Sequence, residues 1–226
     1  KFGKTFPKFE TDKQIGNIQS PDIAVGESGF LNLNLPSNWK TYDVLYVTAT
    51  DQYGRLINTW SWNITKPKDF ISRLVKTNQD KVTATEHDSI LVLSSGKTEI
   101  TFNKNSGLIT GVENNKQAIS FSNGIQFAGF TADFKQMKHY ALDNKQVVEL
   151  IYDSSCHAKF TMLPGGWLQL DYDYQPNGLQ DVAGITFSYP ETLVKGATLL
   201  TDGPFHVWKN RLKGVQFGLF DKSYNN

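Results

Sequence analysis

Two acidic side chains in one extended segment are the first residues that could carry out chemistry. Asp171 and Asp173 alternate with Tyr172 and Tyr174, so the two carboxyl groups share one face of a strand, about 7 Å apart. Glycoside hydrolysis uses two carboxyl groups roughly 5 to 10 Å apart, placed on either side of the glycosidic bond. The same alternation is typical of the solvated face of an outer strand. We interpret the pair in this second way and expect no catalytic residue in the chain.

The histidines do not combine with other ligands at the spacing of a metal site. They are His87, His139, His157 and His206. His157 follows Cys156, the only cysteine, but adjacent residues of a strand point to opposite faces and cannot form a nucleophile–base pair. We therefore expect Cys156 to be a buried structural thiol, and we expect no metal or other cofactor.

The densest group of candidate binding side chains lies in Asp202–Gly214, which reads DGPFHVWKNRLKG. The Gly-Pro pair predicts a turn, Trp208 offers an aromatic face for a sugar ring, and Asn210 and Arg211 offer fixed hydrogen-bond donors. The candidate substrate-binding residues are Asp202, Trp208, Asn210 and Arg211. In the alternative interpretation, Arg211 binds backbone carbonyls of a loop and Trp208 fills the edge of a core.

These side chains need a scaffold, and the hydrophobic pattern predicts one made of antiparallel strands. Val44–Thr50 is rich in β-branched residues, and Leu56–Ile64 returns as its hairpin partner after the turn Asp51–Gly54. Only Lys68–Val75 could form one or two helical turns. Aromatic residues make up 13% of the chain, which suits packing on pleated sheets.

Changes in composition along the chain predict three segments. Residues 1–66 form a small β-sandwich that lacks its beginning, residues 67–88 are a polar linker, and residues 89–226 form a larger all-β domain that stops before its pattern is complete.

Charge and hydropathy exclude several kinds of partner. The net charge is +1, and basic and acidic residues are interleaved, so we expect neither nucleic acid nor an anionic membrane surface as a partner. The longest apolar runs are far shorter than the ~20 residues that span a bilayer. Lys1 opens directly into polar sequence, without the pattern of a signal peptide.

Several motifs resemble one enzyme family. Asp202–Gly214 and Phe217–Asn226 resemble the C-terminal domain of family-2 glycoside hydrolases of the β-galactosidase type, and Ile100–Ile109 is similar to the opening hairpin of that domain. Asp22–Glu27 and Asp51–Trp62 resemble the immunoglobulin-like domain that precedes it in the family. The resemblance covers nearly the whole chain.

The resemblance implies a specific all-β organisation. Residues 1–66 would be an immunoglobulin-like β-sandwich truncated at its N-terminal side, and residues 89–226 a galactose-mutarotase-like antiparallel super-sandwich that is incomplete at its C-terminal side. The family's catalytic glutamates lie in a TIM barrel upstream, so no catalytic residue transfers to this chain. Phe205-His206 stands where relatives commonly have an aromatic residue followed by Arg, and the role of that arginine does not transfer either.

The implied function is that of a non-catalytic C-terminal region of a β-galactosidase-like glycoside hydrolase. Such a region supports the barrel, the substrate cleft or a subunit interface, while the parent enzyme hydrolyses terminal β-galactosides. Its partners would be the TIM barrel, carbohydrate and, in a homo-oligomer, another copy of the parent. The expected compartment is the periplasm or cytoplasm of a bacterium.

Two alternatives stay open. The first is an autonomous carbohydrate-binding module that recognises glycans by aromatic stacking, which a concave row of exposed Trp and Tyr would favour. The second is a mutarotase-like epimerase, for which His157 and Glu149, on separate strands, are the nearest acid–base pair. A large exposed apolar face would instead favour the accessory region.

Overall fold

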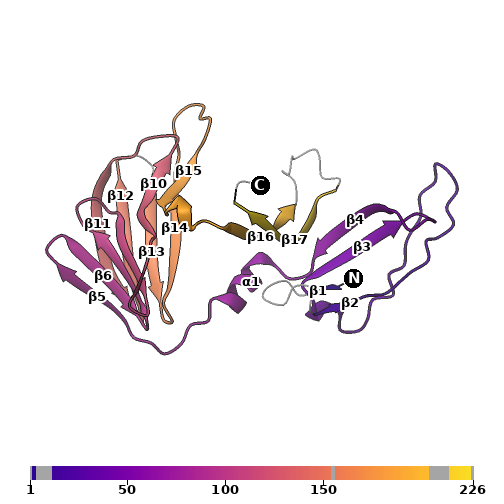
Figure 1. The fold of residues 1–226 in the computed structure, drawn as a ribbon, viewed down its shortest axis with the longest axis horizontal. Helices are drawn as coiled ribbons and strands as arrows, with labels where there is room; N and C mark the ends of the chain where they lie inside the picture. Colours follow the sequence, from indigo (N-terminus) through magenta and orange to yellow (C-terminus); the bar gives the residue numbers. More distant parts are fainter. Residues whose placement is uncertain (1, 4–11, 154–155, 204–213, 225–226) are drawn as a thin grey trace. The chain divides into compact units, whose positions relative to one another are not determined.

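The computed structural model describes residues 2–3, 12–153, 156–203 and 214–224. The chain divides into two compact units, one formed by residues 1–74 with 195–226 and the other by residues 75–194 (Figure 1). The strands pair in antiparallel fashion in both units, which confirms the all-β fold class.

The first unit contains a four-stranded sheet in the order β2-β1-β3-β4. Its strands are β1 (Phe2–Gly3), β2 (Lys13–Gln14), β3 (Val44–Thr50) and β4 (Leu56–Asn63). The 3-10 turn η1 (Trp39–Thr41) precedes β3, and helix α1 (Pro67–Leu74) follows β4. The hairpin partners β16 (Gly196–Gly203) and β17 (Gln216–Ser223) form a separate two-stranded sheet.

Strand β17 packs on one face of the β3–β4 hairpin. Val44 and Tyr46 point to this face and are buried. The backbone N–H of Phe217 donates to Ser61 Oγ at 2.7 Å, and the Tyr46 hydroxyl donates to the Phe217 carbonyl. The Phe217 ring lies 6.2 Å from that of Phe70 on α1. Residues 195–226 therefore belong to the first unit, although the sequence pattern grouped them with residues 89–194.

A buried carboxylate holds α1 against the start of β3. The Asp43 side chain is fully buried and accepts hydrogen bonds from Arg73 Nη1 and Thr65 Oγ1, each at 2.6 Å. The Asp43 carbonyl accepts from the N–H groups of Ile64 and Thr65. A buried charge is costly unless it is paired and hydrogen-bonded, so these contacts fix the direction in which the chain leaves β4.

The second unit consists of two sheets. The larger has the order β15-β10-β8-β7-β6-β5, with β9 beside β8, and the smaller has the order β11-β12-β13-β14. The larger sheet comprises β5 (Val82–His87), β6 (Ile90–Ser95), β7 (Thr98–Asn103), β8 (Ile109–Asn114), β9 (Gln117–Ile119), β10 (Ser122–Ala128) and β15 (Gly184–Ser188). The smaller comprises β11 (Phe134–Leu142), β12 (Lys145–Tyr152), β13 (His157–Leu163) and β14 (Trp167–Asp173), and the 3-10 turn η2 (Glu191–Leu193) follows β15.

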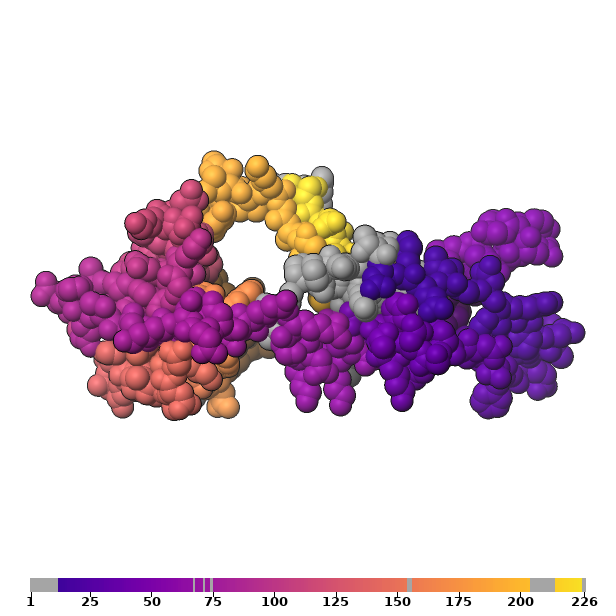
Figure 2. All heavy atoms as spheres, turned by 90° about the horizontal axis from the view of Figure 1, so that it is seen from below, coloured from indigo at the N-terminus to yellow at the C-terminus, as the bar shows by residue number. Residues whose placement is uncertain are grey.

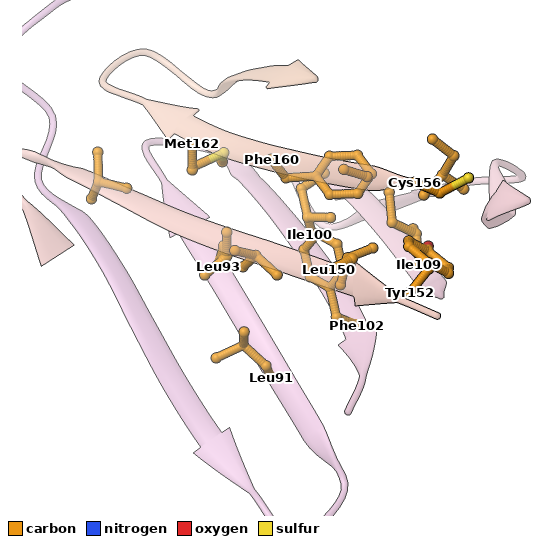
Figure 3. Packing of buried hydrophobic residues seen from close by; sticks show 14 residues of the cluster. Leu91, Leu93, Ile100, Phe102, Ile109, Leu150, Tyr152, Cys156, Phe160 and Met162 are labelled. Carbon is orange, nitrogen blue, oxygen red and sulfur yellow. The ribbon is translucent and has the colours of Figure 1, made fainter. Parts of the chain in front are cut away.

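One apolar layer separates the two sheets of the second unit. Alternate residues of β6 and β7 face alternate residues of β12 and β13, and Figure 3 shows their side chains between the sheets. The rings of Phe102 and Phe160 meet edge to face at 5.2 Å. In Figure 2 the atoms of β5 to β7 (magenta) and of β11 to β12 (salmon) form adjoining layers. The layer includes Leu91, Leu93, Ile100, Phe102, Val148, Leu150, Phe160 and Met162.

Residues 67–88 contain two regular elements, whereas the sequence pattern predicted a linker there. Helix α1 agrees with the helical turns expected over Lys68–Val75. Strand β5 pairs with β6 along its whole length and closes one edge of the larger sheet. Its polar residues Thr83 and Thr85 alternate with Val82 and Ala84, which pack against the core. Every second residue of an edge strand can be polar. The polar composition of this stretch therefore predicted a linker although its alternation is that of a strand.

We expect Leu150→Ala to destabilise the second unit by about 2–5 kcal/mol, because Leu150 is fully buried and its loss leaves a cavity. Leu142→Ala is the matched control, since Leu142 lies on the neighbouring strand β11 and is 51% exposed; its effect should stay within about 0.5 kcal/mol. Hydrogen exchange of peptides from residues 145–163 measures the opening free energy locally. Equal effects of the two substitutions would contradict the assigned core.

Candidate functional site

The candidate binding residues from the sequence fall mainly outside the described part of the chain. Asp202 lies near the end of β16, is exposed, and stands opposite Phe217 of β17. Trp208, Asn210 and Arg211 lie outside the described residues. The grouping of these four side chains into a binding site stays a prediction.

Asp171 and Asp173 lie on the solvated face of β14, as we interpreted them. Their register partners on β13 are Lys159 and His157. Lys159 Nζ lies 3.7 Å from Asp171 Oδ2, and His157 Nδ1 lies 3.2 Å from Asp173 Oδ2. All four side chains are about half exposed or more, so these pairs contribute little to stability.

The structure separates the other pairs that sequence reasoning considered. Cys156 is fully buried in the core, whereas His157 is exposed, which confirms the structural thiol and excludes a Cys–His pair. Glu149 accepts a hydrogen bond from the Tyr140 hydroxyl at 2.8 Å, and this contact raises the pKa of Tyr140. Glu149 and His157 thus bind different partners and do not form the acid–base pair of an epimerase.

Sequence reasoning missed a charged cluster at one edge of the second unit. Glu86 of β5 stands in register with buried Leu91, and His139 of β11 stands in register with buried Val148. Register partners point to the same side of a sheet, so Glu86 and His139 both point inward, from strands at the edges of the two facing sheets. Glu86 keeps 45% of its side chain exposed and His139 30%, so the two side chains meet at the rim of the sandwich and not in its core.

The partners of Glu86 come from three elements. Lys104, just after β7, donates from Nζ to Glu86 Oε2 at 2.7 Å, and His139 Nε2 contacts Glu86 Oε1. The hydrogen bond from Lys104, followed by that from His139, lowers the pKa of Glu86. Glu86 is therefore ionised at neutral pH and ties the edge strands β5 and β11 to the turn after β7.

A pocket of about 540 Å³ lies beside this cluster. Its lining combines a carboxylate, an imidazole and two ammonium groups with amides and two apolar side chains. Glu86 already engages two of the nitrogen groups of this lining, Lys104 Nζ and His139 Nε2. Among the described residues, no group of three His, Cys, Asp or Glu side chains could hold a metal ion. The lining residues are Glu86, Lys104, Asn105, Phe134, Lys135, Gln136, Met137 and His139.

A signal for this cluster was present in the sequence. In Val82–His87 the alternation that places Val82 and Ala84 inward also places Glu86 inward. The signal was missed because this stretch was taken for a linker. The partner on β11 could not be deduced, since nothing in the sequence shows that β5 and β11 lie at the same edge of the sandwich.

Burial also perturbs one group in the core. The side chain of Tyr152 lies against Phe127 and Phe134, with ring centroids 5.0 and 6.0 Å away. Burial, followed by the nearby thiol of Cys156, raises the pKa of Tyr152 to about 12. Its hydroxyl is buried and has no hydrogen-bond partner among the residues that the structure describes.

Comparison with known proteins does not assign the chain to a family: no protein-family model matches it, and no curated protein matches it. Within the described ranges, no helix has the length and apolar character needed to cross a membrane.

We expect Glu86→Gln to flatten the pH dependence of stability in mild acid. The pKa of Glu86 is lowered in the folded state, whereas in the unfolded chain it has the ordinary value of about 4.3. Ionised Glu86 thus stabilises the fold above that value, and this contribution is lost as the pH falls through the folded pKa. Thermal unfolding followed by circular dichroism between about pH 6 and pH 3 should show a steeper loss of Tm in the wild type than in Glu86→Gln.

The matched control is Glu99→Gln, because Glu99 is an exposed residue of β7. This variant should follow the wild-type profile. A Glu86→Gln profile as steep as that of the wild type would show that the cluster does not stabilise the folded state.

Proposed function

We propose that this chain is a non-catalytic accessory region of a glycoside hydrolase of the β-galactosidase type, which hydrolyses terminal β-galactosides with residues outside this sequence. The observation that supports the proposal is an uncovered aromatic face on the first unit. The motif resemblance over Asp202–Gly214 and Asp51–Trp62 supplies the enzyme class.

The aromatic face lies on the β3–β4 hairpin, opposite the face that carries Val44 and Tyr46. Trp60 and Trp62 share this side of β4 and are 44% and 51% exposed. Their register partners on β3 are Val47 and Leu45, so the apolar surface continues across both strands. Contiguous exposed apolar surface of this kind marks an interaction site, and tryptophan is prominent among residues that anchor interfaces.

The chemistry of this face favours a protein partner over a sugar. A carbohydrate site needs several hydrogen-bonding groups around its aromatic residues. The register partners of Trp60 and Trp62 are aliphatic, and on their side of β4 the amide of Asn58 is the polar side chain. A flat sheet face with aliphatic and indole side chains instead suits packing against another domain. We infer that this face packs against other domains of the parent enzyme, among which the TIM barrel is the expected partner.

Three acidic residues of the second unit that lie in charged pairs or clusters fit a non-catalytic role. Asp171 and Asp173 are exposed and lie next to His157 and Lys159, so neither is poised as a buried general acid. Glu86 is held ionised by Lys104 and His139. The shift in the pKa of Glu86 is therefore opposite to the one that a general acid at neutral pH requires.

An antiserum against the chain tests the proposal in lysates of the source cells. We expect an immunoblot band much larger than a polypeptide of 226 residues, and we expect immunoprecipitation to deplete β-galactosidase activity from the lysate. A band at the size of the chain, with all activity left in the supernatant, would refute the accessory role.

The isolated chain should also bind an apolar dye through the uncovered face. We expect the double substitution Trp60→Thr and Trp62→Thr to lower fluorescence of bound ANS by about half, because it removes the largest side chains of that face. Trp167→Thr is the matched control, since Trp167 is 44% exposed but lies on β14 of the second unit. Equal losses in both variants would show that the β3–β4 face is not a preferred apolar surface.

A further inference from the structure

The larger sheet of the second unit forks at β8. This strand pairs with β10 only at Ile109, opposite Gly124, and with β9 only over residues 112–114. Thr110 and Gly111 lie between the two pairings, at the point where β9 and β10 diverge. A groove of about 500 Å³ opens there, and both arms of the fork contribute to its lining.

Two aromatic side chains belong to the lining of this groove. Ser122 of β10 is the register partner of Ser188 of β15, and Phe121 and Tyr189 lie one residue beyond this pair on the two strands. Phe121 stacks on Phe187 with ring centroids 4.8 Å apart and planes inclined by 23°, which fixes its ring. Tyr189 is 46% exposed, so its ring is accessible to a ligand.

The polar groups of the groove are mainly hydroxyls. Thr110, Ser120, Ser122 and Ser188 are the lining residues that carry one, and a hydroxyl can both donate and accept a hydrogen bond. The Thr110 hydroxyl donates to the Thr101 carbonyl at 3.4 Å, and Ser188 Oγ accepts from Asn123 Nδ2 at 3.3 Å, so each keeps capacity to accept or donate one further bond. Glu113 is the charged residue among those that line the groove. Among the described residues that line the groove there is no Lys, Arg or His, so the Glu113 carboxylate would repel a negatively charged ligand without a compensating cation.

We propose that this groove binds a neutral saccharide. A pyranose ring presents an apolar C–H face that can lie on Tyr189 or Phe121, and a rim of hydroxyls that can pair with the serine and threonine hydroxyls. The Glu113 carboxylate can accept hydrogen bonds from two neighbouring sugar hydroxyls. The groove has room for one or two sugar rings. Saccharide binding in this groove would be independent of the proposed accessory role, because the groove is formed entirely by residues of the second unit.

Titration of the ¹⁵N-labelled chain with lactose and with a β-linked galactotriose tests the proposal by NMR. We expect amide shifts concentrated in residues 110–113, 118–122 and 188–189, with millimolar dissociation constants. Tyr189→Ala should weaken binding roughly three- to tenfold, the range that an aromatic contact contributes. Glu113→Gln should weaken it as well, because a neutral amide accepts hydrogen bonds less strongly than a carboxylate.

Tyr172→Ala is the matched control, because Tyr172 is also 46% exposed but lies on β14 of the other sheet. It should bind both sugars like the wild type, and well-dispersed spectra establish that each variant is folded. Three outcomes would overturn the proposal: no shifts with either sugar, shifts confined to residues outside the groove, or equal shifts with sorbitol, which has hydroxyls but no ring.

Discussion

The second unit depends on one constraint: each of its two sheets has an apolar face, and the two faces bury each other. Side chains alternate along a strand, so this closure decides which half of the residues in β5 to β8 and β11 to β14 must be apolar. The buried apolar residues at these positions include Leu91, Phe102, Leu150 and Phe160. The two phenylalanine rings contact each other edge to face within the layer. The other half of each strand is free to be polar.

Two features of the second unit depart from this alternation of apolar and polar residues, and both provide candidate binding groups. Glu86 and His139 occupy inward positions where apolar residues would be expected. They are partly exposed at the edge of the sandwich, where Lys104 and His139 both contact the Glu86 carboxylate. The fork of β8 is a second departure, since the sheet gives up continuous pairing and a groove opens between β9 and β10. Both features lie where regular hydrogen bonding between strands ends. At such places a sandwich can present polar side chains to solvent while its apolar core stays buried.

The first unit uses the two faces of the β3–β4 hairpin differently. Its buried face is covered by α1 and β17, and the ion pair between Asp43 and Arg73 fixes the helix in that position. Its other face leaves Trp60 and Trp62 exposed. Burying large apolar side chains stabilises a structure, and this face is therefore the one that we propose another domain covers.

The sequence by itself determined the all-β class, the β3–β4 hairpin, the solvated face of β14 and the burial of Cys156, because each follows from local periodicity or from the opposite directions of adjacent side chains. Only the tertiary structure decided that β5 closes a sheet, that β17 packs on β4, and that Glu86 meets His139. These outcomes depend on which strands become neighbours, and a period of two residues shows which face a side chain occupies but not what lies opposite it.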